Sequence, residues 1–343
     1  MKKLLSLVLS SILALSFLTA CSSNQPDSSS QIDSTFIPES SSVVDAEGID
    51  VRIAGMKGPT SMGLVSMLDK SEKGESKNNY TFTLAGAPDE ITPKLVKGEL
   101  DIAAVPANLA SVLYNNTNGK IKVLAVNTLG VLYIVEQGET AKNIADLKGK
   151  TIYSTGKGTT PEYALKYLLA QNGLDPEKDV TFEWKSEATE IVAVLKNDPN
   201  AIAMLPQPYV TIAQTEIEGL NASISLNDEW KKLNNGSMLV TGVVVVRDEF
   251  AKEHPEQIAM FLDEYKNSID YVNANADEAS ALIEQFGIFK GPVAKKALPY
   301  CNISFMEGSE MKTAVSGYLN TLFEQNPKSI GGKIPDDDFY YQR

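Results

Sequence analysis

Small polar side chains cluster where the first apolar strand of the chain ends. The strand at residues 51–54 is followed by Gly55-Met56-Lys57-Gly58-Pro59-Thr60-Ser61 and then by a helical pattern up to Leu68. Pro59 is typical of a first helical residue, and Gly58 allows a ligand to approach the backbone closely. The first-turn amides and the hydroxyls of Thr60 and Ser61 would then face an open spot. The stretch predicts a site for a small polar ligand, and an ordinary strand-to-helix loop is the alternative.

A second loop of similar composition lies one hundred residues further along, again between a strand and a helix. It reads Ser154-Thr155-Gly156-Lys157-Gly158-Thr159-Thr160-Pro161. We expect Thr160 to cap the helix and Pro161 to stand in its first turn. Thr155, Gly156 and Thr159 complete the loop as candidate ligand-binding residues. No glycine stands five residues before a Gly-Lys-Ser/Thr, so this is not a Walker A loop but is similar to a cradle for an anion or polar group. Lys157 either adds charge to that cradle or is a solvated lysine.

Two further apolar strands end at a proline that is followed by an amide side chain. Asn108 comes after Val105-Pro106-Ala107, and Gln207 comes after Leu205-Pro206. Proline ends a buried strand, so each amide would stand at a helix start, where it could both donate to and accept from a ligand. Helix capping is the alternative for Asn108, whereas Gln207 is a poor capping residue.

The chain repeats its plan with a displacement of one hundred residues. Gly58, Thr60, Phe82 and Pro106 correspond to Gly158, Thr160, Phe182 and Pro206. Short apolar strands alternate with helical patterns from residue 51 onward, which is typical of α/β folds with mainly parallel sheets. Ligands bind such sheets at the carboxyl ends of the strands. We therefore predict two lobes of like topology that face one another across the site.

Composition narrows the possible functions. The chain has 343 residues, enough for two domains, and its formal net charge of −13 disfavours nucleic acid as a partner. With two cysteines, Cys21 and Cys301, and one histidine, His254, there is almost no material for a zinc cluster or a Cys–His nucleophile. Arginine occurs only at positions 52, 247 and 343, which leaves few guanidinium groups to bind a carboxylate. We expect no metal, no cofactor and no catalytic residue.

Residues 1–20 are typical of a bacterial lipoprotein signal peptide. Lys2 and Lys3 precede an apolar run at residues 4–18, and Leu18-Thr19-Ala20-Cys21 resembles the lipobox, whose cysteine is acylated and becomes the mature N-terminus. Residues 21–48 are rich in serine and almost free of apolar periodicity. They predict a flexible tether with a mean reach of about 28 Å. The alternative is an unmodified signal peptide with a chance cysteine.

Several stretches together resemble the solute-binding lipoproteins of bacterial ABC importers. Besides the lipobox and the tether, they are Ala85-Gly86-Ala87-Pro88, Gly98-Glu99-Leu100-Asp101-Ile102-Ala103, Asp146-Leu147-Lys148-Gly149-Lys150 and Thr241-Gly242-Val243-Val244. The likeness is greatest to the nitrate, sulfonate, taurine and thiamine-precursor binding family, and it covers residues 50 to about 325. The sequence departs from that family at Gln207, which stands where a glutamate or aspartate is expected before Pro208.

This resemblance implies a type II periplasmic-binding fold, in which the chain crosses twice between two lobes and hinge closure traps a ligand. The crossings would lie near residues 128–135 and 240–246. Lobe 1 would comprise residues 50–131 and 243–325, lobe 2 residues 132–242, and a tail at residues 326–343 would pack on the body. Ala87 and the crossing residues Thr128 and Thr241 complete the expected ligand site.

These features together indicate a lipid-anchored protein on the extracytoplasmic face of the cell membrane. We expect it to bind a small polar or anionic organic molecule, to deliver it to an ABC permease and its ATPase, to be a monomer and not to be an enzyme. An enzyme on the same fold, of the type found in menaquinone- and thiamine-precursor pathways, is one alternative, although those enzymes are cytoplasmic and this chain carries a secretion signal. An extracellular ligand sensor is another alternative, which the sequence alone does not separate from an importer component.

Overall fold

Strands alternate with helices through the part of the chain that the structure describes. A computed structural model describes residues 47–343, and the predicted signal peptide, Cys21 and nearly all of the predicted tether lie outside the described residues. The strands are β1 (Asp50–Met56), β2 (Asn79–Ala85), β3 (Ile102–Pro106), β4 (Ile121–Leu129), β5 (Leu132–Glu136), β6 (Thr151–Ser154), β7 (Thr181–Trp184), β8 (Ile202–Pro206), β9 (Asn221–Ser225), β10 (Val240–Arg247) and β11 (Ile303–Met306).

Helices separate most of these strands. The α-helices are α1 (Pro59–Met62), α2 (Val65–Glu72), α3 (Pro88–Val96), α4 (Ala107–Asn116), α5 (Thr160–Gln171), α6 (Ala188–Asn197), α7 (Tyr209–Glu216), α8 (Leu226–Lys232), α9 (Asp248–Glu253), α10 (Pro255–Ala274), α11 (Ala276–Gln285), α12 (Gly291–Ala297) and α13 (Gly308–Gln325). The 3₁₀ turns are η1 (Ile144–Leu147), η2 (Leu298–Tyr300), η3 (Pro327–Ile330) and η4 (Asp337–Phe339). Within residues 47–343, no helix combines the length and the apolar character that a bilayer span requires.

The strands form two sheets, which we name sheet A and sheet B. Sheet A has the order β11-β4-β10-β3-β1-β2, and sheet B has the order β7-β6-β8-β5-β9. In sheet A, β1 pairs parallel with β2 and β3, and β10 lies antiparallel between β3 and β4. In sheet B, β6 pairs parallel with β7 and β8, and β5 lies antiparallel between β8 and β9. Most strands of each sheet therefore run in one direction, and the predicted α/β class with mainly parallel sheets is confirmed.

The two sheets share a register that matches the repeat in the sequence. In sheet A, Ile53 pairs with Phe82 and with Ile102, and in sheet B, Ile152 pairs with Phe182 and with Ile202. The paired residues of β7 and β8 in sheet B thus lie one hundred residues after those of β2 and β3 in sheet A. The first strand falls one residue short of that displacement, because Ile53 corresponds to Ile152. The repeat is therefore present in the fold, but residues of the first strand-to-helix loops are not equivalent number by number.

We refer to the part of the chain built on sheet A as lobe 1 and to the part built on sheet B as lobe 2. The chain passes from lobe 1 to lobe 2 through Gly130 and Val131, between β4 and β5. It returns before Val240, because β10 pairs with β4 from its first residue onward. Asn302, which lies just before β11 in lobe 1, holds the first crossing, since its Nδ2 donates to the carbonyl oxygen of Gly130.

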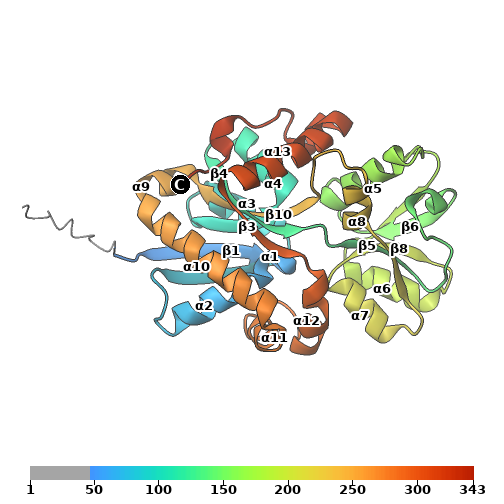
Figure 1. Cartoon of the computed structure of the whole chain (residues 1–343), viewed down its shortest axis with the longest axis horizontal. Helices are drawn as coiled ribbons and strands as arrows, with labels where there is room; N and C mark the ends of the chain where they lie inside the picture. Colours follow the sequence, from blue (N-terminus) through green and yellow to red (C-terminus); the bar gives the residue numbers. More distant parts are fainter. Residues whose placement is uncertain (1–46) are drawn as a thin grey trace, which may run out of the picture. The chain divides into compact units, whose positions relative to one another are not determined.

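Helices cover both faces of each sheet (Figure 1). In lobe 1, α4 and α13 pack on one face of sheet A, and α2, α10 and α11 pack on the other. In lobe 2, α5 and α8 pack on one face of sheet B, and α6 and α7 pack on the other. The apolar core under α4 and α13 continues into the core under α5 and α8. The two lobes are therefore joined by buried apolar contacts as well as by the chain crossings.

Candidate ligand-binding site

The first predicted loop lies at the carboxyl end of β1 and leads into a helix of only four residues, α1. Gly63 is the C-cap of this helix. A Cβ on Gly63 would come within 2.8 Å of Ile269 in α10, so the link between α1 and α2 packs closely against α10. A helix this short has a weak dipole, and the predicted partial positive charge at Pro59 is correspondingly small. Gly58 is buried and has a φ of 154°, and a Cβ there would meet no atom within 4 Å, so there is open space on that side of its backbone.

Thr60 lies at the meeting point of α1, β4 and β10. Its carbonyl oxygen accepts a hydrogen bond of 3.0 Å from Asn127 Nδ2, and a Cβ on Gly242 would come within 2.6 Å of Thr60 Cγ2. Thr128 is fully buried, and its hydroxyl donates to Asn127 Oδ1 at 3.1 Å. The Thr60 hydroxyl itself forms no hydrogen bond within residues 47–343, and Thr60 is only half-buried. Thr60 therefore keeps a hydroxyl available for a ligand, whereas Thr128 uses its own to fix Asn127.

Thr241 is the predicted site residue with the clearest unmet hydrogen bond. It falls at an irregularity of β10, where the partners of Val240 and Gly242 in β4 are the neighbouring residues Leu129 and Thr128. Its Oγ1 is buried and has no hydrogen-bond partner in the part of the chain that the structure describes. An unpaired buried hydroxyl costs about 1–3 kcal/mol, so such a group calls for an explanation. Thr241 precedes Gly242, the residue of β10 that faces Thr60.

The second predicted loop has its own internal hydrogen bonds. The residue that caps α5 is Thr159, not Thr160, and the Thr159 hydroxyl donates to Gly156 O at 2.7 Å. The prediction that Thr160 caps the helix is therefore wrong, because Thr160 is the first helical residue and Pro161 the second. Gly156 has a φ of 79°, which favours glycine at that position. The Thr155 hydroxyl forms no hydrogen bond within residues 47–343, so it is available to a ligand in the same way as that of Thr60.

Asn108 and Thr160 meet at the junction of the two lobes. Thr160 Oγ1 donates to Asn108 Oδ1 at 3.2 Å, and both residues are buried. Asn108 is the second residue of α4 and not its cap, which is Pro106. Because Gly242 pairs with Pro106, this contact lies close to the Thr60 and Thr241 cluster. The structure thus brings Thr60, Thr241, Asn108 and Thr160 into one region.

Three other predicted residues use their polar groups within the chain. The Ser61 hydroxyl is fully buried and donates to Met56 O at 2.6 Å. Gln207 Oε1 accepts from the Thr211 hydroxyl at 2.9 Å and from the Thr211 amide at 3.4 Å, whereas the N-cap of α7 is Pro208. Ala87 N donates to Glu90 Oε1 at 3.0 Å, at the edge of sheet A. Ser61 and Ala87 are thus not placed with free groups at the junction.

Acidic side chains of the protein occupy several helix N-termini near the strand ends. Glu90 Oε1 accepts from the amides of Gly86 and Ala87, and Glu190 Oε1 accepts from that of Glu187 at 2.9 Å. Glu162 Oε2 accepts from Gly158 N at 2.6 Å, at the start of α5. Burial would raise the pKa of Glu162, but hydrogen bonds from Lys166 and the Gly158 amide outweigh it and lower the pKa, so Glu162 is ionised at neutral pH. These carboxylates reduce the attraction of α3, α5 and α6 for an anion.

The arginines of the described chain lie outside the junction, in ion pairs. Arg52 Nη2 and Arg247 Nη2 lie 2.6 Å and 2.9 Å from Asp101 Oδ1, and Arg343 contacts Asp263 and Glu307, each at 2.6 Å. Positive charge near the strand ends comes from lysines instead. Lys57, Lys157 and Lys185 lie in loops that follow strands and form no ion pair within residues 47–343. Lys57 Nζ lies 5.6 Å from the centre of the Phe289 ring, and Lys185 Nζ lies 5.7 Å from that of Tyr153.

Aromatic side chains also connect the lobes on the side of α7 and α12. The rings of Tyr209 in α7 and Phe289, just before α12, meet edge to face with their centres 5.6 Å apart. Since Lys57 lies over the same Phe289 ring, the charge and the aromatic contact share one edge of the junction. A surface hollow of about 470 Å³ at Leu95, Ile121 and Arg247 lies at the opposite end of sheet A, away from every predicted site residue.

The residue that sequence reasoning missed here is Asn127. It is 1% exposed and joins Thr60 to Thr128, which makes it the centre of the polar cluster in lobe 1. A signal was present in the sequence, because Asn127 is an amide inside an apolar strand. A buried amide has to be hydrogen-bonded, so its presence there indicates a polar partner nearby. Tyr318, on α13, was also missed, and no local pattern distinguishes it from an ordinary core tyrosine.

Comparison with known families matches residues 75–296 to a family described as "ABC transporter, phosphonate, periplasmic substrate-binding protein". A protein of Brucella abortus (strain 2308), named only as a binding protein, is 24% identical over 256 residues, which are 74% of this chain and 75% of that protein. The resemblance to solute-binding proteins of ABC importers that the sequence predicts is thereby confirmed, with phosphonate as the family's named ligand.

Solved structures share the fold. A crystal structure of an ABC transporter protein from Parabacteroides distasonis is 25% identical and has a TM-score of 0.71, covering 85% of this chain and 99% of that chain. The periplasmic aliphatic sulphonate binding protein of Escherichia coli is 17% identical with a TM-score of 0.68, covering 85% and 92%. The periplasmic nitrate-binding protein of Synechocystis PCC 6803 is 14% identical with a TM-score of 0.55, covering 77% and 75%.

Proposed function

Because this chain belongs to the family of periplasmic substrate-binding proteins of phosphonate ABC transporters, we propose that it binds a small polar or anionic organic molecule between its two lobes. The observation that carries this proposal is the buried, unpartnered hydroxyl of Thr241. Thr241 precedes Gly242, the residue of β10 that faces Thr60, and the Thr60 hydroxyl is also unengaged. Both threonines lie at the ends of the strands where α/β sheets bind ligands. A ligand oxygen that accepts from both hydroxyls would satisfy the group that the protein leaves unpaired.

The ligand that this site fits best carries an oxyanion such as a phosphonate or sulfonate. The hydroxyls of Thr60, Thr155 and Thr241 can donate hydrogen bonds to such a group. No guanidinium group is available for this role at the junction, because the arginines of the described residues form ion pairs elsewhere. Lys57, Lys157 and Lys185 supply positive charge from the loops around the junction. Proteins of similar fold are named for aliphatic sulphonate and for nitrate, which are oxyanions, and this supports the same class here.

We propose that the ligand is trapped by hinge closure. The first hinge segment is Gly130–Val131, and the second is the stretch before Val240, where the chain returns from lobe 2 to lobe 1. The Tyr209–Phe289 ring contact lies far from the crossings in sequence and joins the lobes directly, so it is a contact that can form and break as the lobes move.

The route to the membrane follows from residues outside the structure. We propose that the lipobox Cys21 carries a lipid anchor on the extracytoplasmic face, that residues 21–48 form the tether, and that the bound ligand passes to an ABC permease driven by its ATPase. Intact mass spectrometry of membrane-extracted protein should show an acylated Cys21 at the N-terminus. An unmodified or different N-terminus would contradict the anchor and leave the binding function untouched.

Native mass spectrometry of the purified protein, followed by calorimetric titration, tests the binding function. The titration panel would contain methylphosphonate, methanesulfonate and nitrate, together with neutral methanol as the uncharged control. We expect one of the oxyanions to bind, and Thr60→Ala to weaken binding by about 10- to 100-fold, the loss of one hydrogen bond to a charged oxygen. Thr117→Val is the matched control, because the Thr117 hydroxyl donates to Leu113 O at the far end of α4. Binding that is equal in wild type and Thr60→Ala would exclude this location.

A further inference from the structure

The C-terminal tail lies along one face of α4. The carbonyl oxygen of Ile330 accepts from Ser111 Oγ at 2.8 Å and from Asn115 Nδ2 at 2.9 Å, and Asn115 Nδ2 also lies 2.8 Å from Lys333 O. Gly331, at φ 89°, lies so close to the helix that a Cβ would come within 3.0 Å of Val112 Cα. Because residues 111 and 115 are four apart, they share one helix face. The tail is therefore held on α4 by side chains that the helical period aligns.

The tail also fixes the orientation of Asn108, which lies one helical turn before Ser111 in α4 and is nearer the lobe junction. Asn108 Nδ2 donates to Ser329 O at 3.2 Å, and this places its acceptor oxygen Oδ1 on the other side of the amide. That oxygen accepts from Thr160 Oγ1 of lobe 2 at 3.2 Å. Asn108 and Thr160 are 5% and 1% exposed, so water does not readily replace either partner. Asn108 thus connects the tail to lobe 2.

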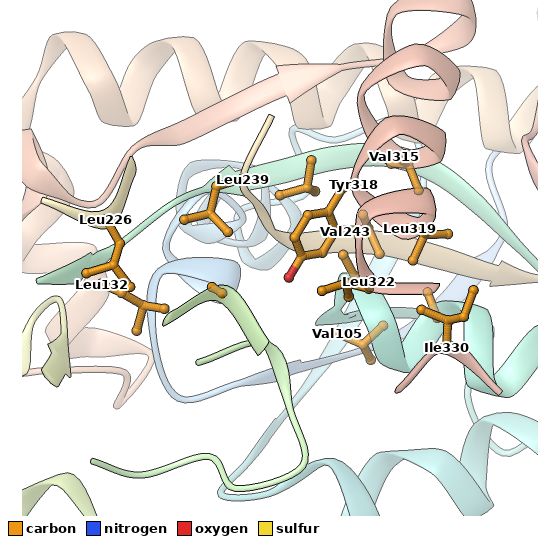
Figure 2. Packing of buried hydrophobic residues seen from close by; sticks show 14 of the residues in the cluster. Val105, Leu132, Leu226, Leu239, Val243, Val315, Tyr318, Leu319, Leu322 and Ile330 are labelled. Atoms are coloured by element: carbon orange, nitrogen blue, oxygen red, sulfur yellow. The ribbon is translucent and has the colours of Figure 1, made fainter. Parts of the chain in front are cut away.

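Tyr318 borders this contact from α13, the helix that precedes the tail. Its ring centre lies 5.7 Å from that of Trp230 in lobe 2, and Figure 2 shows its hydroxyl oxygen pointing away from α13. The hydroxyl is buried and has no partner in the described part of the chain. Burial raises the pKa of Tyr318, and the nearby Thr160 side chain only partly offsets this rise, so Tyr318 stays protonated. Three polar groups therefore meet inside an otherwise apolar interlobe core.

We propose that Asn108 is a positioning residue whose amide is oriented by the C-terminal tail, and that it fixes the first turn of α5 against lobe 1 through Thr160. All the contacts involved lie within the chain, so this role does not depend on the ligand proposed above. Loosening the tail at residues 327–333 then loosens a turn in the other lobe. That turn follows the loop that carries Thr155, which connects the tail to the candidate site.

Hydrogen exchange of the full-length protein without added ligand tests this role. Asn108→Leu keeps the size of the side chain and removes the amide, so we expect the amides of residues 163–168 in α5 to exchange about fivefold faster, the effect of one lost hydrogen bond. Thr160→Val should give the same rise, and Thr160→Ser, which keeps the hydroxyl, should exchange as wild type does. Ser111→Ala removes one tail anchor without touching Thr160 and should speed exchange at residues 327–333 and, to a smaller extent, at residues 163–168.

Ser280→Ala is the matched control. Ser280 is also a buried serine of lobe 1, and its Oγ donates to Asp277 O at 2.7 Å, but it lies in α11. It should leave residues 163–168 at the wild-type rate. If residues 163–168 exchange at the wild-type rate in both Asn108→Leu and Thr160→Val, the positioning role is overturned. If Asn108→Leu does not fold, the result for Thr160→Val alone decides. A Ser111→Ala effect confined to the tail, or an equal effect from Ser280→Ala, would overturn the role of the tail.

Discussion

Replacing Thr241 by valine should strengthen the fold and weaken binding at the same time. Valine has the shape of threonine and suits a strand, so the substitution removes the hydroxyl and little else. The Thr241 oxygen is buried without a partner, and removing an unsatisfied group of this kind relieves about 1 kcal/mol of desolvation cost. For a folded body of this size, that corresponds to a rise in Tm of about 2 °C.

The effect on binding should have the opposite sign. If the Thr241 hydroxyl donates to a charged ligand oxygen, its loss should cost about 1.5–3 kcal/mol, which is a decrease in affinity of about 10- to 100-fold. Most single substitutions at a binding site lower either both quantities or one of them, so opposite signs are a distinctive result. They indicate a hydroxyl that strengthens ligand binding and lowers the stability of the ligand-free protein.

Scanning calorimetry without ligand and titration calorimetry with the bound oxyanion measure the two quantities. Thr211→Val is the matched control, because Thr211 is also buried but its hydroxyl donates to Gln207 Oε1 at 2.9 Å. Thr211→Val should lower Tm, since it removes the shorter of the two hydrogen bonds to Gln207 Oε1 and leaves only that from the Thr211 amide at 3.4 Å. A fall in Tm for Thr241→Val, or an affinity equal to that of wild type, would refute the assignment of Thr241 to the ligand.

Three further outcomes follow from the structure. Burial of Asp101 raises its pKa, but hydrogen bonds from Arg52 and Arg247 outweigh this effect and lower the pKa. The stability that Asp101 contributes is therefore present above pH 4 and is lost as the pH falls through its folded-state pKa. Asp101→Asn should lower the free energy of unfolding by about 2 kcal/mol at pH 7 and by less at pH 3, and equal losses in urea titrations at the two pH values would contradict this. Gly317→Ala in α13 makes only ordinary contacts of 3.5 Å and should raise the free energy of unfolding by about 0.5–1 kcal/mol. Gly242→Ala places a Cβ 2.6 Å from Asn127 Oδ1 and should lower the free energy of unfolding. If denaturant titration gave the same sign for both substitutions, the space at Gly242 would not be limiting. Burial raises the pKa of the Cys301 thiol, so the thiol should not react with iodoacetamide at pH 8 in the native protein. Peptide mapping should find Cys301 unmodified in native protein and modified in urea. Labelling of the native protein at the same rate as in urea would show that the thiol is accessible.

The sequence predicted the fold well because local patterns carry most of its information. Apolar runs that stop at Pro106 and Pro206 became β3 and β8, and the repeat placed Phe82 and Phe182 at matching points in the two sheets. The displacement was one residue too long for the first strand, because Ile53 corresponds to Ile152. Loop length can change by one residue without any change in the strand pattern, so spacing alone does not reveal such a shift.

The site was harder to predict because it depends on which partner each polar atom finds. Ser61 and Thr60 are neighbours of the same chemical type, yet Ser61 donates to Met56 O and Thr60 keeps its hydroxyl unengaged. Thr160 was chosen as the counterpart of Thr60, but it contacts Asn108 across the lobe junction. That pairing joins residues more than fifty positions apart and is oriented by Ser329 in the tail. Contacts of this range leave no periodic signature in a single sequence.

The place of β10 in sheet A has a consequence for the order in which the protein can fold. Its strand, Val240–Arg247, lies between β3 and β4, so the sheet of lobe 1 has a gap at its centre until more than two thirds of the chain has been made. Sheet B has no such gap, since all of its strands come from one uninterrupted segment between Leu132 and Ser225. During synthesis and export, which deliver the N-terminal end first, lobe 2 can complete its sheet while β3 and β4 still lack the strand between them. Those open strand edges are where a chaperone or a second unfinished chain would bind before β10 arrives.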